Sequence, residues 1–144
     1  MTPRLALLAA CLAGTIAPAL AAPKLTDAER AEICAEAEAR YKETTGRAVG
    51  DEPVKTILTY KNLFCPMNFE VKAGDKLRFF NVDKRTSHSV WFRAAGKPES
   101  ERFFPNETYE TTVDLPEGDH ELLCGPHWAN EGMIGRVTVQ GAKP

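Results

Sequence analysis

The stretch Cys124-Gly125-Pro126-His127-Trp128-Ala129-Asn130-Glu131-Gly132-Met133 places a thiol, an imidazole and a thioether close together in the chain. Strand-like runs at residues 121–123 and 134–139 flank it. A second imidazole, that of His88, lies far upstream in another strand-like run, residues 86–92. Two imidazoles, one thiolate and a weak thioether are the donors of mononuclear electron-transfer copper sites. We therefore predict a site for one copper ion, with the ligands His88, Cys124, His127 and Met133.

The chemistry of these donors favours copper over the alternatives. Thiolate and thioether sulfur favour Cu(I), whereas imidazole binds both oxidation states, so one ligand set can hold Cu(I) and Cu(II). Zinc also uses cysteine and histidine, and a structural cysteine beside surface His and Met side chains is a further alternative. The tight turn expected at Gly125-Pro126 and the flanking strands favour the metal site.

Residues 54–139 resemble the cupredoxin family of small type 1 copper proteins. The resemblance is carried by the ligand pattern and by the run 71–79, Val-Lys-Ala-Gly-Asp-Lys-Leu-Arg-Phe. It implies an all-β fold, a Greek-key β-sandwich. In plastocyanin-like members four residues separate the loop His from the Met, but here five separate His127 from Met133. We expect this difference to change the position of the axial sulfur, and with it the blue or green colour of the centre.

The pattern of the chain after Val54 also favours a sandwich. Short apolar runs alternate with turn residues, which is typical of all-β sandwiches. The expected strands cover residues 54–60, 69–71, 77–82, 86–92, 109–113, 120–123 and 134–139. Residues 94–106, rich in Gly, Pro and charge, are expected to form a long loop.

A helix is predicted before the sandwich. Thr26-Asp27-Ala28-Glu29 has the pattern of a capping box. Helical periodicity continues to about Tyr41, and Thr44-Thr45-Gly46 is expected to end the helix. The predicted organisation is a signal peptide at 1–21, a helix and linker at 22–50, and a cupredoxin domain at 51–144.

The first residues have the features of a secretory signal peptide. Arg4 precedes an almost wholly apolar run, and Ala19-Leu20-Ala21 is a small-x-small cleavage site. The alternative is a lipoprotein modified at Cys11, within Leu8-Ala9-Ala10-Cys11. We expect a periplasmic protein cleaved near Ala21, with no further stretch long enough to span a membrane.

Composition narrows the range of partners. The chain has 144 residues, 43% of them apolar and 26% charged, as in one ordinary globular domain. Its net charge of −2 would become −3 after cleavage, because residues 1–21 contain Arg4 and no acid. This weak charge, without a basic run, argues against nucleic acid as a partner.

Export to an oxidising compartment bears on the remaining cysteines. Cleavage near Ala21 would remove Cys11, one of the four cysteines. If Cys124 binds copper, Cys34 and Cys65 are left over, and we expect a disulfide between them. Two free thiols are one alternative. A second copper site that uses Cys65 and Met67 is another.

Residues beside the predicted ligands are expected to tune the copper. The N–H of Ser89, directly after His88, is predicted to donate to the Cys124 sulfur. Pro126 has no N–H, so one donor found near that sulfur in some cupredoxins is absent, which should lower the reduction potential. Trp128 is expected to shield the copper, to contact a redox partner, or to pack against the end of the sandwich.

The residues give little support for an enzymatic function. A binuclear electron-transfer copper site would need a second cysteine in the loop, and copper oxidases or nitrite reductases need further histidines. The third histidine, His120, lies four residues before Cys124 on a predicted strand, and therefore roughly 13 Å away. We predict a packing role for His120 and a protein that is not an enzyme.

Within the family, the sequence is most similar to periplasmic copper-tolerance cupredoxins with a green copper centre. The similarity lies in the cysteine-bearing helix and in residues 64–66, 84–92, 98–105 and 124–128. It implies copper binding with Cu(I)/Cu(II) cycling in copper tolerance or homeostasis. The alternative is a diffusible one-electron carrier, similar to plastocyanin or pseudoazurin, for a respiratory or oxidative enzyme. The expected partners are a copper ion and a redox partner protein.

Overall fold

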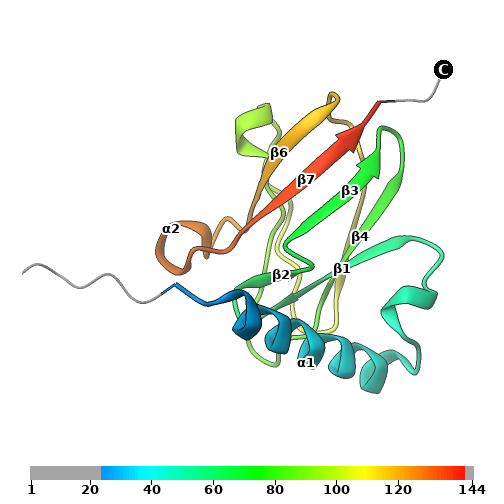
Figure 1. The fold of residues 1–144 in the computed structure, drawn as a ribbon, viewed down its shortest axis with the longest axis vertical. Coiled ribbons are helices and arrows are strands. Elements are labelled where there is room, and N and C mark those ends of the chain that lie inside the picture. Colours follow the sequence, from blue (N-terminus) through cyan, green and yellow to red (C-terminus); the bar gives the residue numbers. More distant parts are fainter. Residues whose placement is uncertain (1–23, 142–144) are drawn as a thin grey trace, which may run out of the picture.

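Two β-sheets packed face to face form the body of the structure, and a long helix lies across one end (Figure 1). The computed structural model describes residues 24–141. The first sheet has the order β2-β1-β4-β5 and contains β1 (Lys55–Tyr60), β2 (Leu63–Cys65), β4 (Lys76–Asn81) and β5 (Thr108–Thr112). The second has the order β3-β7-β6 and contains β3 (Asn68–Lys72), β6 (Gly118–Leu123) and β7 (Ile134–Gln140). The helical elements are α1 (Asp27–Thr45), η1 (Val49–Asp51), η2 (Arg93–Ala95) and α2 (Trp128–Glu131). The predicted β-sandwich with one N-terminal helix is confirmed.

The chain moves between the sheets in a way that brings distant segments together. β1 pairs with β4 in parallel, and β3 pairs with β7 in parallel. The other strand pairs, β1–β2, β4–β5 and β6–β7, are antiparallel. Leu123 pairs with Ile134, so residues 124–133 are the connection of the β6–β7 hairpin. We call residues 124–133 the ligand loop.

The burial pattern of each strand follows from what covers its two faces. β3 alternates exposed and buried residues, as expected where only one face is covered. Five of the six residues of β1 are buried, because the second sheet covers one face and α1 the other. Ile57 of β1 belongs to the core between the sheets, whereas Leu58 belongs to the core beneath α1.

Helix α1 begins with the predicted capping box. The backbone N–H of Glu29 donates to Thr26 Oγ1 at 3.2 Å, and the Thr26 N–H donates to Glu29 Oε2 at 2.7 Å. The helix continues past Tyr41 to Thr45 and ends at Gly46, whose φ of 75° is favourable for glycine. Ala37 and Tyr41 are its buried residues, and the Tyr41 ring meets the Phe80 ring edge to face at 4.9 Å.

A disulfide between Cys34 and Cys65 joins α1 to β2. The expected pairing is therefore present in the structure. It also removes the alternative of a second copper site at Cys65 and Met67, because a disulfide sulfur is not a thiolate. Met67 instead packs, partly buried, against the core beneath α1.

The run 86–92, predicted as a strand, is not a continuous strand. His88 forms a single bridge with Phe103, and Trp91 forms a single bridge with Leu123 of β6. The segment changes its partner within three residues, so no ladder develops along it. The predicted loop at 94–106 supplies one of those partners. β2 and α2 were not predicted, since each is too short to produce a clear periodicity.

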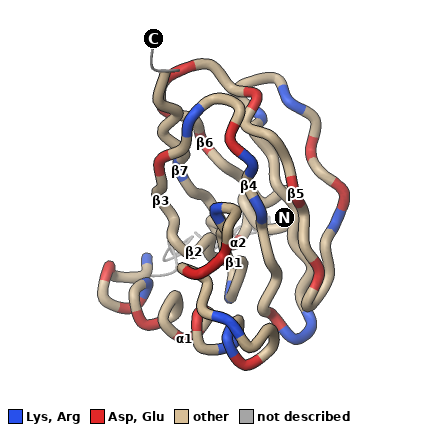
Figure 2. The backbone as a smooth tube through the Cα atoms, turned by 90° about the vertical axis from the view of Figure 1, so that its right-hand side faces the viewer, with Lys and Arg blue, Asp and Glu red and all other residues tan. Residues whose placement is uncertain are grey.

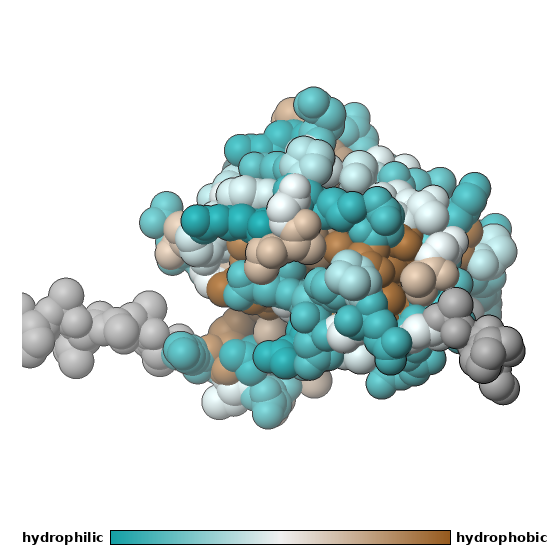
Figure 3. Space-filling view, turned by 90° about the horizontal axis from the view of Figure 1, so that it is seen from above, coloured by the Kyte–Doolittle hydropathy of each residue, from teal (hydrophilic) through white to brown (hydrophobic). Residues whose placement is uncertain are grey.

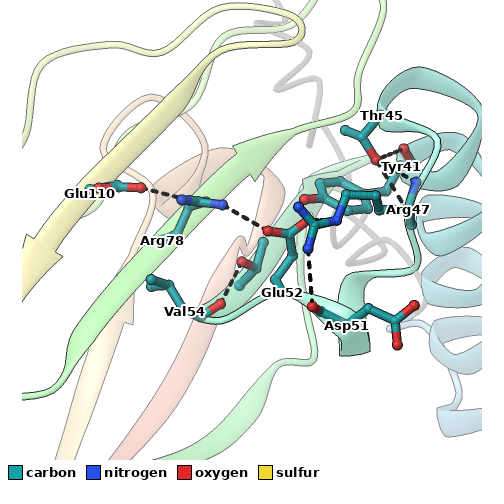
Figure 4. Close-up of polar contacts among 9 residues, drawn as sticks. Tyr41, Thr45, Arg47, Asp51, Glu52, Val54, Arg78 and Glu110 are labelled. Atoms are coloured by element: carbon teal, nitrogen blue, oxygen red, sulfur yellow. Dashed lines mark hydrogen bonds and ion pairs between the residues drawn. The ribbon is translucent and has the colours of Figure 1, made fainter.

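A network of charged groups fixes the linker between helix α1 and strand β1, residues 46–54 (Figure 4). Glu52, whose side chain is only 7% exposed, accepts a hydrogen bond from Arg78 Nη1 at 3.1 Å. Arg78 Nε donates to Glu110 of β5 at 2.7 Å, and Arg47 lies 3.5 Å from the other Glu52 oxygen. Burial and the neighbouring Glu52 carboxylate raise the pKa of Tyr41. The linker therefore packs as part of the folded body.

The surface carries both signs of charge. Figure 2 shows Lys and Arg interspersed with Asp and Glu along the strands and loops. Seen from above, apolar residues are visible between polar ones (Figure 3). The predicted signal peptide, with Cys11 and the cleavage site at Ala21, lies outside the described residues.

Candidate metal centre

The structure brings three of the four predicted ligands to one point. One donor atom each from His88, Cys124 and His127 lie within 4.8 Å of one another. Cys124 Sγ is 3.3 Å from His127 Nδ1 and 3.6 Å from His88 Nδ1. In each of the two imidazoles, Nδ1 is thus the nitrogen that faces the sulfur. Among residues 24–141 this is the one group of at least three His, Cys or acidic side chains with such spacing.

The backbone sets His88 and Cys124 side by side. His88 and Phe103 exchange two hydrogen bonds of 3.0 Å, and Trp91 and Leu123 exchange bonds of 2.9 and 3.0 Å. The second pair ties the His88 segment to the last residue of β6, directly before Cys124. His88 and Cys124 are both fully buried. The two donors are therefore held by contacts between segments far apart in sequence.

The ligand loop is closed by its own backbone. The N–H of Cys124 donates to the Met133 carbonyl at 3.2 Å, and the N–H of His127 donates to the Cys124 carbonyl at 2.9 Å. The residues between His127 and Met133 form the turn α2 and then Gly132, with φ 69°. The extra residue of the loop is thus absorbed in one helical turn that ends on a left-handed glycine.

Met133 is fully buried and belongs to the same core cluster as Cys124. Its N–H donates to the His127 carbonyl at 3.3 Å. The backbone therefore carries the thioether into the interior at the end of the ligand loop, where the chain enters β7.

Burial controls the protonation of the donors. It raises the pKa of the Cys124 thiol, while the backbone N–H groups of Ser89 and His127 act in the opposite direction. Burial also lowers the pKa of His127, which favours the neutral imidazole. A buried thiol becomes a thiolate readily when a cation binds it, and neutral imidazole is the form that binds metals. The donor set therefore fits a soft metal cation.

Asp83 is a functional neighbour that the sequence did not reveal. Its Oδ2 lies 2.7 Å from Nε2 of His88. An Nε2–H that donates to this carboxylate leaves the Nδ1 lone pair directed at the site, as carboxylates do for metal-binding histidines. The available signal was an acidic residue five positions before His88, which is too common a pattern to single out.

The other predicted neighbours have distinct surroundings. The Ser89 hydroxyl accepts a hydrogen bond from the Gly125 N–H at 2.9 Å, in addition to the effect of its own N–H on the sulfur. Pro126 is half-buried within the ligand loop. The N–H of His127, one residue further on, is a backbone donor near the sulfur that was not predicted.

Trp128 is half-buried, and the Arg93 guanidinium carbon lies over its ring, 5.2 Å from the ring centroid. The same guanidinium is 5.4 Å from the Trp91 ring. Cation–π contacts of this kind tie the loop to η2. His120 lies outside the cluster, with Nε2 2.7 Å from the Pro116 carbonyl oxygen.

A sandwich that holds a His-Cys-His cluster at one hairpin defines a class of small copper-binding proteins. Residues 57–140 match the family described as copper binding proteins, plastocyanin/azurin family, and the chain belongs to it. As a member with these donors, it has a site for one copper ion.

Individual relatives agree with this membership. The chain is 33% identical to plastocyanin of Solanum crispum and 34% identical to that of Vicia faba, each over 88 residues, covering 53% of this chain and 86% of the relative. The fold resembles that of the oxidized P96G mutant of amicyanin, with a TM-score of 0.54 and 21% identity, covering 62% of this chain and 85% of that one. None of the helices within residues 24–141 is long and apolar enough to cross a membrane.

Proposed function

We propose that this protein is a one-electron redox protein whose single copper ion is bound by His88, Cys124, His127 and Met133. The observation that carries the proposal is the convergence of His88 Nδ1, Cys124 Sγ and His127 Nδ1 within 4.8 Å. A bound copper ion would supply a Cu(I)/Cu(II) couple. The residues supply a mixed set of soft and intermediate donors, which suits both oxidation states.

The scaffold limits rearrangement of the donors. His88 is held by paired backbone hydrogen bonds and by Asp83, and Cys124 and Met133 are fully buried. Close-packed interiors resist displacement of their side chains. His127 is the partly exposed ligand, so the route for an electron to and from a partner lies through its imidazole, beside Trp128.

Spectroscopy of the Cu(II)-loaded protein tests this assignment. The wild type should show an intense thiolate-to-copper absorption and a type 1 EPR signal, and Cys124→Ser should lose the absorption because it requires the Cu–S bond. His88→Ala or His127→Ala should open a position that added imidazole occupies. His120→Ala, which removes a histidine outside the cluster, is the matched control and should keep the wild-type spectrum. A Cys124→Ser protein with the full wild-type spectrum would disprove the proposal.

Two physiological roles are open to such a site, in an exported, periplasmic protein. The role of electron carrier is supported by the plastocyanin relatives. A role in copper tolerance is supported by the disulfide-linked helix α1, which precedes the matched residues 57–140 and resembles copper-tolerance cupredoxins. We favour copper tolerance, because capture of Cu(I) and transfer of its electron to a redox partner protein would leave Cu(II) and protect thiolate sites elsewhere.

Growth of a deletion strain distinguishes the two roles. We expect normal growth in low copper and poor growth in high copper, restored by the wild-type copy and not by the Cys124→Ser copy. A respiratory defect in low copper, together with normal growth in high copper, would instead establish the electron carrier.

A further inference from the structure

A carboxylate on the surface is connected to the ligand loop through a buried hydroxyl. Ser89 is fully buried, and its Oγ lies 2.7 Å from Glu99 Oε1 and 2.9 Å from the backbone nitrogen of Gly125. Gly125 is the residue that follows Cys124. Glu99 lies in the long loop between η2 and β5, far in the sequence from Cys124 and Gly125.

The direction of these hydrogen bonds is determined by the groups involved. An ionised carboxylate only accepts hydrogen bonds, and a serine hydroxyl has a single O–H to donate. Ser89 therefore donates to Glu99 and accepts from the Gly125 N–H. Because Glu99 takes the only hydroxyl hydrogen, an oxygen lone pair of Ser89 is held toward the ligand loop.

Two further contacts show that this arrangement is built into the fold. Ser100, next to Glu99, donates its N–H to the Val90 carbonyl at 2.9 Å, and its Oγ accepts from the Val90 N–H at 2.9 Å. These bonds fix the backbone directly after Ser89 to the backbone directly after Glu99. A Cβ at position 125 would overlap the Glu99 carboxylate, so the close approach requires glycine there.

We propose that Glu99 is a positioning residue for the copper ligand Cys124, acting through Ser89 on the Gly125 amide. This inference rests on the proposed function in that Cys124 is taken as the ligand. Glu99 orients the Ser89 hydroxyl, and this hydroxyl accepts the hydrogen bond from the Gly125 N–H. The backbone directly after Cys124 is therefore held in place, and with it the Cys124 side chain. The carboxylate also places a negative charge at the end of this chain of hydrogen bonds, which favours the more highly charged Cu(II).

The first test uses metal-free protein and does not depend on copper. Amide hydrogen exchange at Gly125, measured by NMR, should be about tenfold faster in Glu99→Ala, because a charge-assisted hydrogen bond is lost. Glu99→Gln should show a smaller increase, since its amide oxygen can still accept from Ser89. The matched control is Glu101→Ala, which removes an exposed acid two residues away. Within residues 24–141 its side chain makes no hydrogen bond or ion pair, so Gly125 should be unchanged.

The second test uses Cu(II)-loaded protein. The reduction potential should rise in Glu99→Gln and Glu99→Ala, and by more than in Glu101→Gln, which removes the same charge without touching Ser89. The thiolate-to-copper absorption should shift in Glu99→Ala and stay close to the wild type in Glu99→Gln. If Glu99 had only a structural role, Glu99→Gln would not raise the reduction potential while keeping the wild-type absorption.

Gly125→Ala supplies an independent arm. The added methyl should displace the Glu99 carboxylate. Amide hydrogen exchange at the loop residues next to position 125 should then be as fast as it is in Glu99→Ala. In the Gly125→Ala background, Glu99→Ala should then have little further effect, because both changes break one contact.

The outcomes separate this inference from the proposed function. Gly125 exchange in Glu99→Ala equal to that in Glu101→Ala would overturn the positioning role, whatever the potentials show. A wild-type protein without thiolate-to-copper absorption would reject the copper assignment, while the metal-free exchange would still decide whether Glu99 positions the loop.

Discussion

The region around helix α1 and the region around the copper ligands are held by different kinds of interaction. In the helix region, a disulfide, a network of charged groups around Glu52 and a separate apolar core bind α1 to the first sheet. In the copper region, backbone hydrogen bonds and the buried Ser89 hold the donors, within the core between the sheets. Much of the stabilising chemistry therefore lies away from the copper ligands. Changes in the helix region should leave these ligands largely in place, although the two regions adjoin at Val82 and Asp83.

The largest expected effect is loss of the disulfide. Cys34→Ala/Cys65→Ala should lower the free energy of unfolding by about 3–4 kcal/mol, because the bridge closes a loop of about thirty residues in the unfolded chain. Denaturant unfolding measures the loss, and the copper spectrum should remain that of the wild type. A changed spectrum would show that the helix region and the copper region are coupled. Two additional free thiols in the wild type, by intact mass after non-reducing purification, would contradict the pairing.

A smaller effect is expected from the linker network. Glu52→Gln should cost about 2 kcal/mol, because the Arg78 guanidinium loses its nearly buried carboxylate partner. Glu110→Gln, which removes the other partner of Arg78 at a site 46% exposed, is the matched control and should cost less. Thermal unfolding of the three proteins gives the order. Equal losses in both variants would mean that burial of Glu52 adds nothing.

In the copper region we expect the reduction potential to change with little loss of stability. Met133→Leu conserves side-chain volume and should cost less than about 1.5 kcal/mol. It should keep copper and raise the reduction potential, because a weak donor that favours Cu(II) is removed. Met67→Leu, in the core beneath α1, is the control, and its potential should equal that of the wild type. Voltammetry that finds no difference between the two variants would exclude Met133 as a ligand.

The smallest effect concerns pH. Hydrogen bonds from Lys61 and then Tyr60 lower the pKa of Glu36 in α1 from 4.5 to about 2. A carboxylate with a lowered pKa stabilises the fold above its unfolded pKa and loses that contribution as the pH falls toward 2. The melting temperature of the wild type should thus exceed that of Glu36→Gln at pH 7, with a gap that narrows below about pH 4.5.

Because Glu36 is exposed, that gap should be small and decrease with added salt. Glu38→Gln, in the same helix at an exposed position, is the control. A gap that widens in acid would contradict the assigned direction of the pKa shift.

Local patterns accounted for the features that depend on neighbours in sequence. The capping box of Thr26 and Glu29 was predictable because both partners lie in one turn. The donor types of the ligand loop identified copper chemistry, since softness is a property of the side chains themselves. The family resemblance supplied the sandwich, and the number of cysteines left by Cys124 indicated the disulfide.

Contacts between residues far apart in the chain became visible only in the folded structure. The bridges of His88 and Trp91, to Phe103 and Leu123, replaced a predicted strand by two isolated pairings. Asp83 and Glu99 resemble any other acidic residue in the sequence. They acquire a role only where folding places one beside His88 and the other, through Ser89, beside the ligand loop. The physical reason is that periodicity and composition report short-range preferences, whereas the surroundings of a side chain depend on how separate segments pack together.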